Sequence, residues 1–343
     1  MRFYVLSDLH LKKDNELDAI EMIKKVCEKI RISSKLDETI LFFILGDVAD
    51  KGNAKSFDLA SACLNTIRSE LRNYKVVFEF VPGNHDLINN NLKEFDDFTA
   101  SQGNYHSFEK EPVYSKQYEN VNFIFADSNL SRDPSSPGRI DINGIRSQCK
   151  SNMTNVLLFH HGLTFEDDDD KHNLIENPNK IIEQLKDMPI QYFFHGHKHY
   201  ASIYANDFVD IGCGCFCEEV DWKAYVFNQF IVGYIDSGII VKVERWGYSG
   251  DSRQQFMSET LYPSPKDFDD PAKINKINYS KPDKYISRTV SLYEDMNKSE
   301  IQRYFDTKPK KNLFEVITKD HNKIFLLAGA GMGKSLECKN LAF

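Results

Sequence analysis

The sequence predicts an α/β fold over residues 1–246. Short apolar runs alternate there with longer stretches whose apolar residues recur at helical spacing. Apolar side chains make up 41% of the 343 residues, which is enough to form a buried core. This alternation is typical of layered architectures in which helices cover the faces of a sheet.

The first part of this region contains three predicted strands and two predicted helices. Phe3–Leu6, Ile40–Leu45 and Val76–Val81 are apolar runs that end at polar or glycine-containing turns, so we expect buried strands. Between them, Asn15–Ile32 and Phe57–Leu71 carry apolar residues at helical spacing. Both are therefore predicted to be amphipathic helices.

The remainder of the region continues the alternation. Asn179–Lys186 follows Pro178 and is predicted to be a helix. Phe230–Ile235 and Ile239–Glu244 flank Asp236-Ser237-Gly238, which predicts a hairpin. The other predicted strands are Val121–Ala126, Asn155–Phe159 and Gln191–Phe194.

The composition changes after Trp246. Residues 247–312 contain several prolines, many Lys and Asp residues and few apolar runs, which predicts a linker with some helix, such as Ser299–Phe305. Residues 313–343 contain the predicted strand Lys323–Leu327 and then a glycine-rich loop. We expect them to be the beginning of a further domain.

Charge and composition exclude several classes of protein. The formal net charge of −8 gives no general attraction to nucleic acid or to an anionic membrane. The sequence has neither a signal peptide nor a run of about 18–20 apolar residues, so we expect a cytoplasmic protein with no membrane partner. Seven cysteines, an odd number, argue against a disulfide framework. Cys213-Gly-Cys-Phe-Cys217 is interpreted as a strand with buried thiols.

Five short polar motifs each follow an apolar run, and together they carry the chemistry. They are Asp8-Leu9-His10, Gly46-Asp47-Val48-Ala49-Asp50, Gly83-Asn84-His85-Asp86, His160-His161 and Gly196-His197-Lys198-His199. One such motif alone is weakly specific. Five in this order are hard to obtain by chance, and they supply Asp, Asn and His side chains together.

This mixture of residue types suits a pair of divalent metals. Ligands that were all oxygen would favour Mg²⁺ or Ca²⁺, whereas added imidazoles favour transition metals. Two metals about 3.5–4 Å apart neutralise phosphate oxygens and supply a hydroxide nucleophile at neutral pH. The residue types therefore suit a two-metal site of the kind that hydrolyses phosphoesters. Mn²⁺ is our first expectation for the metals, with Fe or Zn as alternatives.

The five motifs resemble those of the calcineurin-like metallophosphoesterase superfamily over residues 1–246. The resemblance implies a four-layer α/β-β/α sandwich with the metals at the carboxyl ends of the central strands. It also implies that Asp47 is shared by both metals. The other implied ligands are Asp8, His10 and His199 for one metal, and Asn84, His160 and His197 for the other.

Two further roles come with this resemblance. His85 would point at the scissile phosphate and stabilise or protonate the leaving oxygen, and Asp50 would orient His85. Of the adjacent pair, the resemblance favours His160 as the ligand. His161 would then contact the substrate or a ligand.

The glycine-rich loop fits a Walker A pattern, with Ala328 in place of the usual first glycine. Backbone amides around Gly329, Gly331 and Gly333 would surround the phosphates of ATP. Lys334 would reach the β- and γ-phosphate oxygens, and Ser335 would bind Mg²⁺.

This segment, with Tyr285-Ile-Ser-Arg288 before it, resembles the P-loop region of STAND/NACHT-type ATPases over residues 285–343. Members of that family include anti-phage defence proteins that place an effector enzyme before the ATPase. The resemblance implies self-assembly through the ATPase and sensor region. Because the given sequence stops at Phe343, we expect the protein to continue into a nucleoside-triphosphatase domain.

The substrate is less well defined by the sequence. Asp86 and Lys51 stand where Ser/Thr protein phosphatases of the superfamily usually have Glu and Arg, which disfavours that activity. A nuclease effector is the first hypothesis. A small-nucleotide or cyclic-nucleotide phosphodiesterase or pyrophosphatase is the second, and a non-catalytic assembly module is the third.

Local features bear on these alternatives. The acidic run Glu166–Asp170 is interpreted as a solvated loop, or else as a segment that repels long polyanions from the site. Nucleic acid would require a basic track and aromatic platforms. Candidates for these are Lys12, Lys13, Lys198, Lys223, Tyr105, His106 and Phe108.

Overall fold

The computed structural model divides into two compact units, Met1–Pro271 and Ala272–Phe343. The structure describes residues 1–12, 16–35, 38–50, 54–163, 174–199, 201–205, 208–217, 227–248, 256–261, 289–290 and 311–312.

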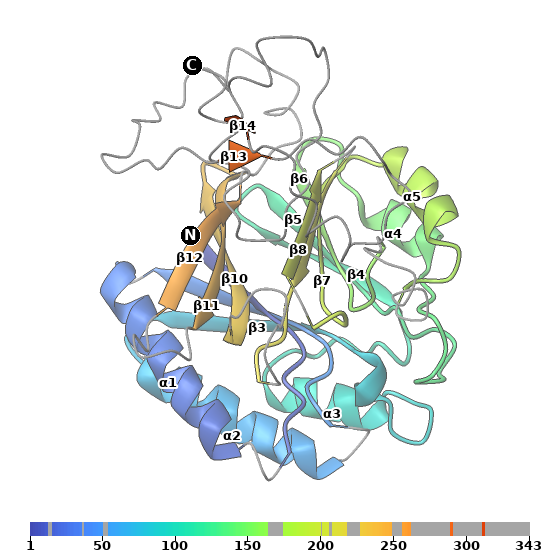
Figure 1. The fold of residues 1–343 in the computed structure, drawn as a ribbon. Coiled ribbons are helices and arrows are strands. Elements are labelled where there is room, and N and C mark those ends of the chain that lie inside the picture. Colours follow the sequence, from blue (N-terminus) through green and yellow to red (C-terminus); the bar gives the residue numbers. More distant parts are fainter. Residues whose placement is uncertain are drawn as a thin grey trace. The chain divides into compact units, whose positions relative to one another are not determined.

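The first unit contains two six-stranded sheets (Figure 1). The strands of one sheet are β1 (Arg2–Leu6), β2 (Thr39–Leu45), β3 (Lys75–Val81), β10 (Phe227–Asp236), β11 (Ile239–Tyr248) and β12 (Phe256–Leu261). Their order is β12-β11-β10-β1-β2-β3. β1, β2 and β3 are parallel, whereas β10 pairs antiparallel with both β1 and β11.

The second sheet has a similar mixture of directions. Its strands are β4 (Val113–Tyr118), β5 (Val121–Ala126), β6 (Thr154–Leu158), β7 (Ile190–His195), β8 (Ala201–Ala205) and β9 (Val209–Cys213). Their order is β4-β5-β6-β7-β9-β8, and only the edge strands β4 and β8 run antiparallel to their neighbours. The parallel strands of both sheets are followed by polar loops. The predicted motifs lie in these loops.

Helices cover the outer faces of the sheets (Figure 1). They are α1 (Glu16–Ser33), α2 (Ala54–Glu70), α3 (Lys93–Ser101), α4 (Ile142–Gln148) and α5 (Pro178–Lys186). α1 buries Ile23, Val26 and Ile30 in the same core as the first sheet, as its helical spacing predicts. α4 and α5 contribute Ile145 and Leu185 to a second core against the other sheet.

Aromatic side chains fill the space between the two sheets. The ring centroid of Phe43 on β2 lies 4.6 Å from that of Phe123 on β5, and Phe3 on β1 lies 5.5 Å from Phe123. All three side chains are fully buried. Facing aromatic side chains of this kind join the sheets through a large apolar contact. The predicted α/β class, with two sheets flanked by helices, is confirmed.

One strand lies inside the stretch that the sequence assigns to a linker. β12 pairs antiparallel with β11 along Val243–Tyr248 and so extends the first sheet beyond residue 246. Phe256 packs on Trp246, with ring centroids 6.2 Å apart. A six-residue edge strand flanked by polar and proline-containing sequence has little apolar patterning, which explains why the sequence did not indicate it.

The described residues of the second unit form a short antiparallel pair, β13 (Thr289–Val290) and β14 (Lys311–Asn312). The predicted helix Ser299–Phe305, the strand Lys323–Leu327 and the whole of the P-loop lie outside the described residues. Among the helices that the structure describes, none is both long and apolar enough to cross a membrane.

Candidate metal centre

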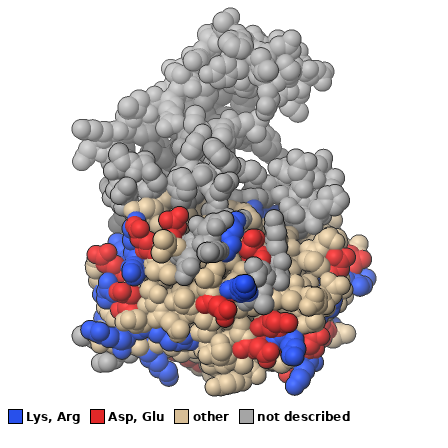
Figure 2. All heavy atoms as spheres, turned by 90° about the horizontal axis from the view of Figure 1, so that it is seen from below, with Lys and Arg blue, Asp and Glu red and all other residues tan. Residues whose placement is uncertain are grey.

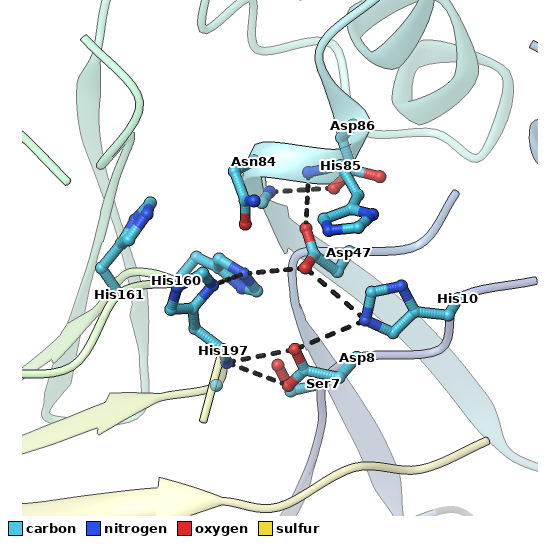
Figure 3. A network of polar contacts seen from close by, with 12 residues as sticks. Ser7, Asp8, His10, Asp47, Asn84, His85, Asp86, His160, His161 and His197 are labelled. Atoms are coloured by element: carbon cyan, nitrogen blue, oxygen red, sulfur yellow. Dashed lines mark hydrogen bonds and ion pairs between the residues drawn. The ribbon is translucent and has the colours of Figure 1, made fainter. Parts of the chain in front are cut away.

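All seven predicted metal ligands lie just beyond the carboxyl ends of parallel strands. In the first sheet, Asp8 and His10 follow β1, Asp47 follows β2 and Asn84 follows β3. In the second sheet, His160 follows β6, and His197 and His199 follow β7. Figure 3 shows side chains from both sheets turned toward one another. Ligand sites commonly occupy this edge of parallel sheets.

The loops that carry these ligands adopt an uncommon backbone conformation. Positive φ angles occur at Asp8 (53°), His10 (41°), Asp47 (49°), His197 (67°) and His199 (57°). Non-glycine residues seldom adopt this region, and clusters of such residues are typical of functional sites. The strand-end loops therefore bend sharply to point these side chains inward.

Three of the ligands converge as a first half-site, which we define as Asp8, His10 and His199. The Nε2 atoms of His10 and His199 are 3.1 Å apart, and His199 Nε2 lies 3.5 Å from Asp8 Oδ1. One donor atom from each residue can be chosen so that all three lie within 4.8 Å of one another. Donor atoms that face each other at this spacing are suited to a shared cation.

A second half-site consists of Asn84, His160 and His197. His160 Nε2 lies 3.1 Å from His197 Nδ1. One donor atom from each of His160, His197 and Asp47 also lies within 4.8 Å of the other two. The Nδ1 of His160 donates to the backbone oxygen of Leu45 at 2.6 Å. This bond leaves His160 Nε2 directed into the site as the possible ligand.

Asp47 lies between the two half-sites. Its Oδ2 is 3.1 Å from His160 Nε2 and 3.6 Å from His10 Nε2. Its Oδ1 accepts the backbone N–H of His85 at 2.8 Å. The position suits a carboxylate that is shared by two metals, as the sequence predicts.

The amide of Asn84 provides a test of whether these residues fit metals. Its Nδ2 donates to the backbone oxygen of Pro134 at 3.1 Å, whereas its buried Oδ1 has no hydrogen-bond partner among the described residues. A buried acceptor without a donor is unfavourable unless something else fills that role. A cation beside Oδ1 would do so, and the combined donor set of carboxylate, amide and imidazole groups suits a transition metal.

The electrostatics of the site reflect its burial. Burial raises the pKa of Asp47, but the neighbouring His160, His10 and His85 outweigh this effect and hold that pKa well below its usual value. Burial alone would lower the pKa of His160, yet Asp47 raises it to about 9. Burial, with His161 and His160 nearby, holds the pKa of His197 well below its usual value.

His85 lies beside the first half-site. Its ring meets the ring of His10 edge to face, with centroids 4.8 Å apart, and its backbone is fixed on Asp47. Asp50, which the sequence assigns to orienting His85, has Oδ1 4.0 Å from His10 Nδ1. The orienting role of Asp50 stays a prediction.

Asp86 lies in a ligand motif, but the sequence alone assigned it no role in the site. Its carboxylate accepts the backbone N–H groups of Ala49 and Gly83, both at 2.9 Å, and so joins two ligand loops. Burial and the charge of Asp47 raise the pKa of Asp86 to about 7. Its place directly after Asn84-His85 was the available signal.

The residues after β5 also belong to the site, although the sequence analysis did not identify them. Ser128 Oγ lies 2.8 Å from His161 Nδ1, and the His161 ring packs on that of His197 with centroids 4.4 Å apart. Burial and the proximity of His160 lower the pKa of His161 to about 3. His161 thus stands behind a ligand of the second half-site, as one of its two predicted roles requires.

His195 directly precedes the last motif but is not one of the predicted ligands. It is buried on β7, with Nε2 3.2 Å from Asp210 Oδ1. The predicted nucleotide-binding residues Gly329, Gly331, Gly333, Lys334 and Ser335, and the acidic run 166–170, lie outside the described residues.

Two mixed sheets bring the ends of their parallel strands together, and the paired donor sets there are suited to the two metals of a binuclear metallohydrolase. The chain belongs to the calcineurin-like phosphoesterase family, whose family model matches residues 1–201. This family uses a binuclear divalent metal centre, and membership implies a metal-dependent phosphoester hydrolase.

Two individual proteins illustrate the similarity. The chain is 22% identical over 213 residues to a protein of Xenorhabdus bovienii named a probable cyclic nucleotide phosphodiesterase, covering 58% of this chain and 78% of the relative. A dimetal phosphatase from Danio rerio has a similar fold, with a TM-score of 0.53 and 14% identity over 77% of this chain and 99% of that one.

Proposed function

We propose that this chain is a phosphodiesterase that uses two divalent metals, with Mn²⁺ preferred. The position of Asp47 carries the proposal, because its carboxylate lies between two complete donor sets with His85 beside them. The bound metals would neutralise the phosphate oxygens and activate the attacking water.

The chain's own residues would orient the substrate and handle the proton. His85 is partly exposed beside the site, whereas the ligands Asp8, Asp47 and His160 are buried. A histidine in this place can donate a proton to the leaving oxygen as the ester bond breaks. This is the role that the sequence assigns to His85.

We further propose a small or cyclic nucleotide as the substrate. The printed name of the Xenorhabdus bovienii relative supports this class. Among the residues considered for binding nucleic acid, Lys198 and Phe108 are buried, and His106 stacks on Tyr114 with centroids 4.0 Å apart. Tyr105 alone among these four is exposed. These four side chains give little support to a polymer surface, and the candidates Lys13 and Lys223 lie outside the described residues.

The surface charge is consistent with a small substrate. Figure 2 shows basic and acidic side chains interspersed over the described part of one face, without a continuous basic track there. A nucleic-acid backbone would require such a track. Nucleic acid is nevertheless the second candidate, because the P-loop motif at residues 328–335 suggests an effector enzyme joined to a STAND-type ATPase.

That larger arrangement is a proposal from the sequence alone. It comprises a linker over residues 247–312, an ATPase that begins at residue 313, ATP with Mg²⁺ at the P-loop, and self-assembly through the ATPase and sensor region. A cytoplasmic location and a role in anti-phage defence belong to the same proposal.

The test compares substrates under one condition, with the purified chain and Mn²⁺. The substrates are bis-p-nitrophenyl phosphate, its monoester analogue, cyclic nucleotides, single- and double-stranded DNA, and RNA. We expect turnover of the diester and the cyclic nucleotides, and none in an Asp47→Ala variant. Cleavage of DNA or RNA that depends on Asp47 would move the assignment to a nuclease, and turnover of the monoester alone would contradict a phosphodiesterase.

A further inference from the structure

We propose that the segment Asp127–Gly138, which we call the support segment, sets the metal affinity of the second half-site while leaving the first half-site unchanged. The proposal rests on the two-metal function proposed above. It arises from where the segment's contacts go, since they reach Asn84 directly and His197 through His161.

The first contact fixes the amide of Asn84. The backbone oxygen of Pro134 accepts from Asn84 Nδ2 at 3.1 Å, so the amide oxygen is turned to the opposite side. Asn129 Nδ2 donates to the backbone oxygen of Pro82 at 3.0 Å and holds the turn that carries Asn84. The segment thus sets which amide atom faces the metal position.

The second contact runs through His161. The backbone N–H of His161 donates to Ser128 Oγ at 3.3 Å, which leaves the Ser128 hydroxyl able to donate to His161 Nδ1 at 2.8 Å. The ring so fixed packs on His197, with centroids 4.4 Å apart. Because such outer contacts orient a ligand ring, they tune metal affinity.

The far end of the segment closes on the same ring. A Cβ atom at Gly138 would lie 2.6 Å from His161 Cγ, so only glycine leaves the ring in its observed place. Gly138 is fixed in turn, since its N–H donates to the Leu174 oxygen at 3.0 Å and its oxygen accepts from Glu176 at 2.7 Å. Movement of His161 away from His197 is restricted on this side.

The middle of the segment is anchored by a buried charge. Arg132 forms an ion pair with Asp127, whose side chain is fully buried. The Nη2 of Arg132 also donates to the backbone oxygen of Phe108 at 3.2 Å. Asp127 also accepts the backbone N–H of Asn129 at 2.7 Å. These bonds make the segment a fixed support.

The contacts that hold the first half-site come from outside the support segment. They include the backbone N–H of His197, which donates to both carboxylate oxygens of Asp8 at 3.1 Å. Cys215 Sγ lies 3.1 Å from the Asp8 oxygen, and the backbone N–H of Phe216 donates to the Ser7 oxygen at 3.1 Å. His10 is tied through its backbone N–H to the Asp47 oxygen at 2.9 Å. A change in the support segment therefore acts on the second half-site.

The experiment is a calorimetric titration of the metal-free full chain with Mn²⁺. We expect two binding events in the wild-type chain, of which His199→Ala removes the one at the first half-site. Ser128→Ala and Gly138→Ala should each weaken Mn²⁺ binding at the second half-site by about 10- to 100-fold. The affinity of the first event should stay within about twofold in both variants, given the separate contacts that hold it.

The matched control is Ser136→Ala, in the same segment. Among the described residues its hydroxyl donates to the exposed Asp133 alone, at 2.8 Å, so both binding events should stay unchanged. If Ser128→Ala does not fold, as judged by circular dichroism, Gly138→Ala tests the same inference through a different contact with His161.

Three outcomes overturn the inference. Equal weakening of both events would indicate general loosening, and unchanged affinities in Ser128→Ala and Gly138→Ala would show that the support segment has no effect. Weakening in Ser136→Ala as strong as in Ser128→Ala would remove the specificity of the contact. A wild-type chain that binds fewer than two metals would instead contradict the proposed two-metal function itself.

Discussion

Several of the predicted ligand residues adopt a left-handed backbone conformation that is unfavourable for residues other than glycine. A left-handed backbone at a non-glycine residue costs on the order of 1–3 kcal/mol and persists only when its surroundings fix it. At Asp8 and His10 the surroundings are the β2 loop, through hydrogen bonds to the backbone oxygens of Gly46 and Asp47. The geometry of each ligand thus depends on a loop distant in the sequence.

The role of His85 predicts a separation between metal binding and turnover. In His85→Ala the ligands stay in place, so we expect two bound metals, whereas kcat for bis-p-nitrophenyl phosphate should fall by about 10²–10⁴-fold. Metal content and kcat measured on the same preparation test this. Loss of metal together with activity would make His85 a ligand and not a proton donor.

The pKa of His160 predicts how the stability of the metal-free protein depends on pH. Asp47 raises this pKa to about 9, whereas the ordinary value is 6.5, so the folded state binds the proton more tightly than the unfolded state. The contribution to stability is complete below pH 6.5 and is lost as the pH rises toward 9. Urea unfolding in EDTA should therefore show a loss of about 2 kcal/mol between pH 7 and 9.

A His160→Asn variant is the control for this effect. Because it removes the titrating group, the loss between pH 7 and 9 should be much smaller. The comparison starts at pH 7 because the pKa of Asp86 is raised to about 7, so most of its effect on the unfolding free energy falls below that pH. A variant with the same loss as the wild-type chain would contradict the assignment to His160.

The sequence indicated the candidate ligands, but not the residues that hold them. Motif order, through the family resemblance, pointed to Asp8, Asp47 and Asn84, each of which lies two or three residues after a buried strand. Ser128 and Pro134 act through contacts with His161 and Asn84, and contacts between distant loops leave no local pattern in a single sequence. Strand-end position after β5 was the only signal for Ser128.

The loops after β2 and β3 approach each other too closely for side chains. Gly46 has φ +84°, and a Cβ atom there would lie 2.4 Å from the backbone nitrogen of Gly83. A Cβ atom at Gly83 would lie 2.1 Å from Asp47 Oδ1. Glycine at both positions therefore lets the loops bring Asp47 and Asn84 together.

This close approach gives a prediction with an internal control. Gly46→Ala and Gly103→Ala place alanine at φ +84° and φ +91°, but the Cβ at Gly103 meets nothing within 4 Å. Gly103→Ala should cost about 1–2 kcal/mol of unfolding free energy, and Gly46→Ala about 2–5 kcal/mol. Denaturant unfolding checks both values.

Metal binding distinguishes these two variants further. Gly46→Ala should also weaken Mn²⁺ binding because it displaces Asp47, whereas Gly103→Ala should bind Mn²⁺ as the wild-type chain does. Equal stability losses in the two variants would show that the approach of the β2 and β3 loops is not a constraint.

Elements with strong apolar patterning were predictable, and short polar elements were not. β2 (Thr39–Leu45) and β5 (Val121–Ala126) lie within one residue of their predicted bounds because they are nearly continuous apolar runs. β9 (Val209–Cys213) was missed because Asp210 and Gly212 interrupt its apolar pattern. The strand expected over Cys213–Cys217 is wrong, because the chain leaves β9 at Cys213 and turns at Gly214, which has φ +71°. α4 has seven residues, too few for helical spacing to appear.

In the first unit as a whole, the candidate centre joins the two sheets. Asp8, His10 and Asp47 come from the first sheet, whereas His160, His197 and His199 come from the second. Each half-site contains residues from both sheets, so the donor set is complete only when the sheets are packed on each other. The aromatic contacts between Phe43 and Phe123 hold that packing.

The sequence predicted this architecture through its resemblance to a family, while composition and periodicity alone predicted only layered α/β structure. The antiparallel edges, β4 and β8, could not be read from the chain, because edge pairing is set by contacts between segments and not by local pattern. The residue types of the candidate site could therefore be read from the sequence, whereas the contacts between those residues are known only from the structure.

We propose that the carboxylate of Asp47 is shared by two catalytic metals. The most direct measurement is Mn²⁺-dependent hydrolysis of bis-p-nitrophenyl phosphate by the wild-type chain and by Asp47→Ala. We predict Mn²⁺-dependent turnover by the wild-type chain and its complete loss in the variant, since removing the shared carboxylate empties or separates both metal positions. Wild-type rates in Asp47→Ala would contradict the account.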